Sequence, residues 1–105
     1  MSGGPIWGAA SEDLNATILA WPAGAGPAEH ENPARDVLYV VLEGSARLTV
    51  EGEERELQAG EALIVEKGTT RALVAGPDGV RYLTAHLRRE PLQIAPRLAR
   101  RPPRI

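Results

Sequence analysis

The stretch Gly24–Gly44, GAGPAEHENPARDVLYVVLEG, decides how this chain can fold. Its first half is rich in proline and glycine, which is typical of a loop. The loop leads into the apolar run Val37–Leu42, which ends at Glu43-Gly44. Because the run is short and bounded by turn residues, it predicts a β-strand that is covered on both faces. His30 and Asn32 are two residues apart, so in an extended loop their side chains point the same way and can address one binding site.

The rest of the chain predicts further short strands separated by turns. Ser45–Val50 alternates between apolar and polar residues, as a half-exposed strand does. Glu51-Gly52 and Ala59-Gly60 predict tight turns, and Gly76–Gly79 predicts a strong one. No amphipathic helix is expected before residue 90. The predicted strands are Asn15–Trp21, Val37–Leu42, Ser45–Val50, Arg55–Leu57, Ala62–Val65, Thr69–Ala75 and Val80–Leu87. This pattern predicts an all-β sandwich or barrel.

The length of 105 residues fits one domain. We expect an N-terminal arm at 1–13, a barrel at 14–90 and a C-terminal strap rich in proline and arginine at 91–105. The chain has no cysteine, which excludes disulfides and thiolate ligands. It shows no leader pattern at its N-terminus and no apolar run of the roughly 20 residues that a membrane span needs. A cytoplasmic protein without a membrane partner is therefore expected.

The net charge of −2 hides an asymmetry. Residues 1–87 hold 6 basic and 13 acidic side chains, whereas residues 88–105 hold 6 arginines and Glu90. A basic tail can bind nucleic acid, but this tail is interrupted by prolines and has no aromatic residue to stack on bases. We therefore do not expect nucleic-acid binding, and we expect the tail to dock on an acidic face of its own or a neighbouring subunit.

Two stretches, Gly24–Gly44 and Gly60–Ala75, have a residue spacing that resembles the two motifs of the cupin superfamily. The spacing of Gly24, His30, Asn32, Val37 and Gly44 is that of the first motif, whose pattern is glycine, two histidines, glutamate and glycine. The second motif has the pattern glycine, proline, glycine, histidine and asparagine, and the matching residues are Gly60, Glu66, Gly68, Arg71 and Ala75. The resemblance implies a small single-domain cupin, an antiparallel jelly-roll β-barrel with an interior pocket.

The motif spacing is kept, but the usual metal ligands are not. In metal-binding cupins the histidines and the glutamate hold the ion, and here only His30 is retained. Asn32, Val37 and Arg71 occupy the other ligand positions. An amide is a weak ligand, valine is none, and a guanidinium repels a cation. We predict no metal cofactor. The alternative is a divalent metal held unconventionally by His30, His86 and an outside carboxylate.

Arg71 at an inward position would need an anion, either a ligand or an internal partner such as Glu31, Asp36 or Glu66. His30 could bind a ligand or act as an acid or base, and the alternative is a hydrogen bond to a loop carbonyl. Tyr39 shares the face of Val37, where its hydroxyl could serve the pocket or be satisfied as part of the core. The sequence does not say whether His86 faces inward. The predicted ligand-binding residues are therefore His30, Asn32, Val37, Tyr39 and Arg71.

We expect a cupin that binds a small, anionic organic molecule in its barrel without the usual metal. One alternative is a metal-dependent enzyme, an oxygenase or isomerase, and another is a non-catalytic barrel for oligomerisation or partner binding. Whether the protein is an enzyme stays open, and His30 is the catalytic candidate. The two-sided apolar strand, Trp7 in the arm and the strap predict a covered outer face and hence a homodimer.

Overall fold

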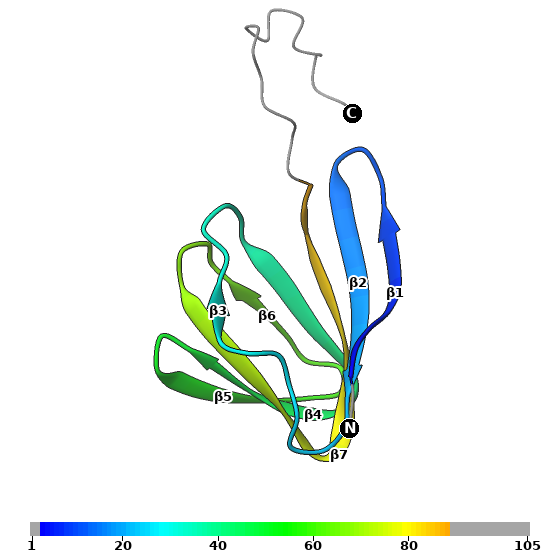
Figure 1. The fold of residues 1–105 in the computed structure, drawn as a ribbon, viewed down its shortest axis with the longest axis vertical. Coiled ribbons are helices and arrows are strands. Elements are labelled where there is room, and N and C mark those ends of the chain that lie inside the picture. Colours follow the sequence, from blue (N-terminus) through cyan, green and yellow to red (C-terminus); the bar gives the residue numbers. More distant parts are fainter. Residues whose placement is uncertain (1–2, 89–105) are drawn as a thin grey trace, which may run out of the picture.

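A computed structural model of the protein describes residues 3–88. These residues form an antiparallel jelly-roll barrel built from strands and connecting loops (Figure 1). Apolar alternation and frequent turn residues explain why strands form here. The strands are β1 (Gly4–Ala10), β2 (Leu14–Trp21), β3 (His30–Glu31), β4 (Val37–Val50), β5 (Glu53–Gln58), β6 (Ala62–Val65) and β7 (Thr70–Leu87). The predicted all-β class is confirmed.

The long strands β4 and β7 pair along most of their length and belong to both walls of the barrel. The first half of β4 pairs with the second half of β7, and β6 and the hairpin β1-β2 extend this wall. We call it the first sheet, in the order β1-β2-β7-β4-β6. The second half of β4 pairs with the first half of β7, and β3 and β5 extend this second sheet.

Both long strands pass from one sheet to the other at a corner, which corrects two predictions. The strand beginning at Val37 was expected to end at Glu43-Gly44, but β4 continues through a bulge at these residues. Gly76–Gly79 was expected to reverse the chain, but β7 continues through it as well. Gly44 pairs with Val80 and Ala46 with Ala75, so Gly76–Gly79 bulges out opposite a single residue. Bulges bend strands without ending their pairing, which is how a strand turns a barrel corner.

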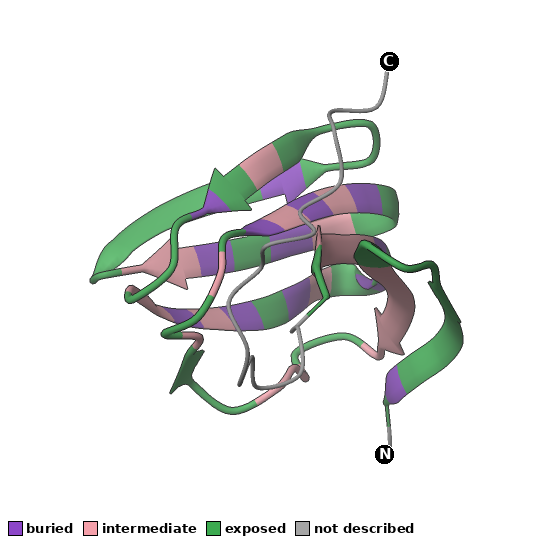
Figure 2. Ribbon diagram, turned by 90° about the horizontal axis from the view of Figure 1, so that it is seen from above, coloured by how far each residue is buried: buried purple, intermediate pink, exposed green. Residues whose placement is uncertain are grey.

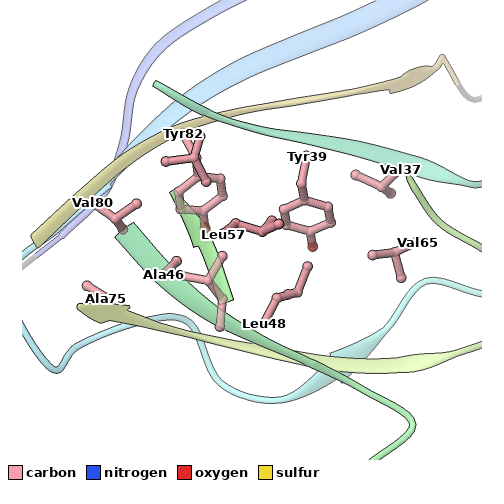
Figure 3. Close-up of a cluster of buried hydrophobic side chains, with 11 residues drawn as sticks. Val37, Tyr39, Ala46, Leu48, Leu57, Val65, Ala75, Val80 and Tyr82 are labelled. Atoms are coloured by element: carbon pink, nitrogen blue, oxygen red, sulfur yellow. The ribbon is translucent and has the colours of Figure 1, made fainter. Parts of the chain in front are cut away.

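The side chains that face inward form one hydrophobic core. Burial alternates along the strands, which appears as banding in Figure 2. On β4, Ala46 and Leu48 are buried and Arg47 between them is exposed, as the alternation of Ser45–Val50 predicts. The first half of β4 is half-buried on its outer face at Leu38 and Val40. The core comprises Val37, Tyr39, Val41, Ala46, Leu48, Leu57, Val65, Leu73, Ala75, Val80 and Tyr82 (Figure 3).

The predictions for the two terminal segments have different outcomes. Within the predicted arm, residues 4–10 form strand β1, which pairs with β2 at the edge of the first sheet. The predicted strap, 91–105, lies outside the described residues. Across residues 3–88 there is no helix with the length and apolar character that crossing a membrane requires.

We predict that Gly44→Ala strongly destabilises the fold because Gly44 lies at the corner. Its φ is +75°, and a Cβ there would lie 2.1 Å from the carbonyl oxygen of Gly79. Left-handed strain alone costs about 1–2 kcal/mol, so with the collision we expect a loss of more than about 2 kcal/mol in urea unfolding.

Gly60→Ala is the matched control for this prediction. Gly60 has a φ of +91°, but a Cβ there would meet nothing within 4 Å. This variant should therefore lose only about 1 kcal/mol, the cost of strain without collision. Equal losses in the two variants would show that the close approach at the corner is not a constraint.

Candidate functional site

Arg71 lies inside the barrel, as its motif position implies. It is 1 % exposed and is the buried charged residue of the described chain. Near the start of β7 it pairs on one side with His30 of β3 and on the other with Val50 of β4. Residues directly opposite in neighbouring strands project to the same face of a sheet. The register therefore brings His30, Val50 and Arg71 to one face at one end of the barrel.

The guanidinium of Arg71 is held by backbone carbonyls. Its Nε donates to the carbonyl oxygen of Thr69 at 3.2 Å, and an Nη donates to the carbonyl oxygen of Glu66 at 3.3 Å. Among residues 3–88 no carboxylate forms an ion pair with Arg71, so the predicted internal partners Glu31, Asp36 and Glu66 do not neutralise it. Asp36 instead accepts a hydrogen bond from the backbone N–H of Lys67 at 2.9 Å. Carbonyls orient the cation but leave its charge unpaired.

Tyr39 brings a hydroxyl to this cation. Burial raises the pKa of Tyr39, and the charge of Arg71 and a hydrogen bond from it lower the same pKa in part. The net direction is upward, so the phenol is protonated at neutral pH. It can therefore accept a hydrogen bond from Arg71 and still donate its own proton to a ligand.

Tyr82 is the neighbour of Tyr39 that the sequence did not identify as a site residue. The two rings stack with centroids 5.9 Å apart, and both lie in the core (Figure 3). Burial raises the pKa of Tyr82 to about 12. The signal available in the sequence was that Tyr82, Thr84 and His86 share one face of a strand. The pairing of Thr84 with buried Tyr39 identifies that face as the inner one.

His30 lies at the exposed edge of the site. Its Nδ1 is 3.0 Å from the carbonyl oxygen of Ala28. This is the hydrogen bond to a loop carbonyl that was expected as the alternative to ligand binding. A carbonyl can only accept, so Nδ1 carries a proton, and Nε2 is the ring nitrogen that points away from this bond. His30 thus shares the face of Arg71 but remains in contact with solvent.

The structure places the other predicted residues as follows. Asn32 is half-buried, and its Oδ1 accepts the backbone N–H of Ala34 at 3.1 Å, which shapes the loop before β4. Its own carbonyl accepts the N–H of Gly68 at 2.9 Å and so ties the two motif loops together.

Val37 is buried in the core. His86 is half-buried near the end of β7, with Nδ1 2.9 Å from the carbonyl oxygen of Leu87.

The donor set around Arg71 does not fit a divalent metal. Val37 offers no donor, Asn32 Oδ1 is engaged by the backbone, and Arg71 contributes a buried positive charge. In the described part of the chain, no three His, Asp or Glu side chains are grouped so that they could hold an ion. A cation placed here would meet charge repulsion in a medium of low dielectric constant.

Residues 17–86 match the family model described as a cupin domain. Among curated proteins, the chain is similar to the dimethylsulfoniopropionate lyase DddW of Ruegeria pomeroyi, with 37% identity over 60 residues. The match covers 54% of this chain and 40% of the lyase, so the chain spans about two fifths of that relative's length.

Two solved structures have the same fold at moderate identity. KdgF from Halomonas sp. superposes with a TM-score of 0.72 at 26% identity, covering 78% of this chain and 76% of KdgF. A cupin protein from Bacteroides fragilis superposes with a TM-score of 0.67 at 29% identity, covering 80% of this chain and 73% of that one. Each likeness covers about four fifths of this chain.

We predict that alkaline pH destabilises the fold through Tyr82. Its pKa is about 12 in the folded protein and close to 10 when unfolded, so between these values the folded state retains a proton that the unfolded state loses. The contribution of Tyr82 to the free energy of unfolding is therefore fully present below pH 10 and is lost as the pH rises. At pH 12 the loss amounts to about 2 kcal/mol.

Urea unfolding between pH 8 and pH 12 measures this loss. Tyr82→Phe should lack the Tyr82 component and Tyr39→Phe should retain it, each curve being normalised to its own value at pH 8. Parallel curves for the wild type and Tyr82→Phe would contradict the assignment.

Proposed function

The chain belongs to the cupin family, and we propose that it binds a small organic anion in its barrel through Arg71. The observation that supports this is a guanidinium that is 1 % exposed and has no carboxylate partner among residues 3–88. Burying an ion costs several kcal/mol unless an opposite charge compensates for it. A ligand carboxylate or phosphate would supply that charge.

The geometry of Arg71 suits such a ligand. A guanidinium has five N–H donors, and two of its hydrogen bonds go to the carbonyls of Thr69 and Glu66. These bonds fix the plane of the group in advance, so little side-chain entropy is lost when an anion binds. Tyr39 adds a neutral hydroxyl beside the cation, and its phenolic proton can bond a second ligand oxygen.

We propose His30 as the acid or base that acts on the bound molecule. Its Nδ1 is directed to the carbonyl of Ala28, so Nε2 is left to accept a proton from, or a hydrogen bond of, a ligand held at Arg71. Such an arrangement could serve lyase or isomerase chemistry on a small acid.

The similarity to a dimethylsulfoniopropionate lyase favours a carboxylate over a phosphate. The name of that relative denotes a small propionate, and 54% of this chain aligns with it. A carboxylate can bind a guanidinium through two parallel hydrogen bonds. Small carboxylates and sugar acids, with dimethylsulfoniopropionate among them, are therefore the first compounds to test.

Thermal-shift screening of these acids, followed by calorimetry of the hits, tests the proposal. Ligand that binds only the folded state raises Tm. Arg71→Met should weaken binding of each hit about 10- to 100-fold, because a charge-assisted hydrogen bond contributes about 1.5–3 kcal/mol. Arg71→Lys should recover part of the affinity by restoring the charge without the planar fork.

The matched control is Arg81→Met, which removes an exposed arginine paired with Glu43 at 3.8 Å. It should bind every hit as the wild type does. A folded Arg71→Met variant that binds equally well would refute the role of Arg71. Metal analysis of protein purified without an affinity tag separates the alternative function: a stoichiometric, chelator-resistant ion would favour a metal-dependent oxygenase or isomerase.

We also propose that two copies of the chain pair through part of the outer face of the first sheet. The register places Trp7 opposite Ile18 on this face, in line with Leu83 and Val40 of the neighbouring strands. Trp7 is 50% exposed, and Leu42 beside this row is 41% exposed. Contiguous apolar side chains on a sheet face favour a covering partner, and a two-fold symmetric pair is the simplest one.

Light scattering at micromolar concentration tests this pairing. The wild type should have the mass of a dimer, and Trp7→Asp should shift it to a monomer because a charge would be buried at the interface. Val74→Asp is the control, since Val74 is similarly exposed but lies on the second sheet. A monomeric wild type would refute the proposal.

A further inference from the structure

An apolar groove lies at the other end of the outer face of the first sheet, away from Trp7. It encloses about 500 Å³. The register explains its composition, since Leu14 pairs with Leu87 and Leu38 pairs with both Ala85 and Ile64. These side chains therefore form one surface across β2, β7, β4 and β6.

The walls of this groove are unusually exposed for their chemistry. Leu87 and Ile64 are each 62% exposed, and Leu14 is 49% exposed. Asp36 and Lys67 stand at its border and are joined through the Lys67 backbone N–H, so the border is ordered. An apolar surface with a polar border is the usual form of a docking site.

The chain itself continues from this groove. Leu87 forms part of its wall, and Arg88 is anchored beside it by donating its backbone N–H to the carbonyl oxygen of Asp13 at 2.9 Å. Arg88, the last described residue, therefore lies beside the groove, and 17 further residues follow it in the sequence. The first part of this segment, 91–98, has the sequence PLQIAPRL, with apolar Leu92 and Ile94, and most of the arginines come later.

We propose that residues 91–98 dock in this groove on their own chain. Leu87 and Ile64 are separated by two strand spacings, roughly 10 Å. An extended chain covers up to about 3.5 Å per residue, so Leu92 and Ile94 can both reach across the groove from Leu87. No second copy is needed to bring the segment there, which favours the segment's own chain as the occupant.

The chemistry of the segment fits a sheet face better than a sheet edge. Pro91 and Pro96 lack an N–H and cannot extend a hydrogen-bonded ladder. A sheet face requires only apolar side chains from the segment that covers it. Because a proline-containing segment does not pair with the sheet, its backbone N–H and C=O groups remain hydrogen-bonded to water. Leu92 and Ile94 are two residues apart, so in an extended segment they point to the same side. The sequence predicted that the strap docks on an acidic face, whereas the docking proposed here would place it on an apolar one.

Disulfide trapping in the full-length chain tests the inference, and the absence of native cysteine makes the readout clean. The variant Ile64→Cys with Ile94→Cys should form an intrachain disulfide under mild oxidation. The control, Val74→Cys with Ile94→Cys, places the first cysteine at an exposed site on the second sheet. A docked segment should crosslink to position 64 about tenfold faster than to position 74, because docking raises the local concentration.

The other outcomes overturn the proposal in distinct ways. Equal rates at positions 64 and 74 would mean that the segment is free in solution. A disulfide between two chains would mean that the segment of a second copy occupies the groove, and no crosslink at all would mean that another element covers it.

A second measurement avoids cysteines altogether. Ile94→Asp should release the segment and raise the fluorescence of a dye that binds exposed apolar surface. Gln93→Asp adds the same charge at the adjacent position, which points the other way, and should leave the fluorescence unchanged. Equal responses of the two variants would refute docking through Ile94.

Discussion

The antiparallel pairing of β4 with β7 joins the two sheets of the barrel and positions all the other strands. These strands cross both sheets, so every other strand reaches its place by pairing with them or with a strand that does. The pairing survives the corner because Gly44 adopts a left-handed conformation and approaches Gly79 more closely than any side chain would permit. The same register places His30 and Val50 on either side of Arg71. The same strand register therefore determines both the fold and the position of the candidate site.

A buried cation gives the barrel its chemical character. Hydrogen bonds to the carbonyls of Thr69 and Glu66 orient Arg71, but neither oxygen neutralises it. An apolar core of this kind penalises an unpaired charge far more than water does. The residues at the ligand positions of the motifs therefore suit a cation poorly, which is why we propose an anion as the ligand. The motif spacing is unchanged because it serves the strands and turns, whereas the residues at the ligand positions determine which ion is favoured.

The outer face of the first sheet follows from the same register. Because side chains alternate along a strand, the residues between the core positions of β4 and β7 form a second surface. Leu38, Val40, Leu83 and Ala85 make that surface apolar, and exposed residues extend it at both ends. An apolar run without alternation, such as Val37–Leu42, already signals this in the sequence, since both faces must find cover. Within residues 3–88 that cover is incomplete, because Leu38 and Val40 are half-buried and Leu42 is 41% exposed.

The all-β class, the hairpin at Glu51-Gly52 and the alternation of Ser45–Val50 could be predicted from the sequence, because they follow from local rules of turn chemistry and side-chain period. The family was indicated separately, by the resemblance of the motif spacing to that of the cupins. Only the tertiary structure decided that the predicted strands on either side of each corner are continuous, that Tyr82 stacks on Tyr39, and that carbonyls rather than carboxylates hold Arg71. Alternation defines two faces of a strand but not which one is inside. Which face is inside depends on pairing between residues far apart in the chain, and a local sequence pattern carries no information about that pairing.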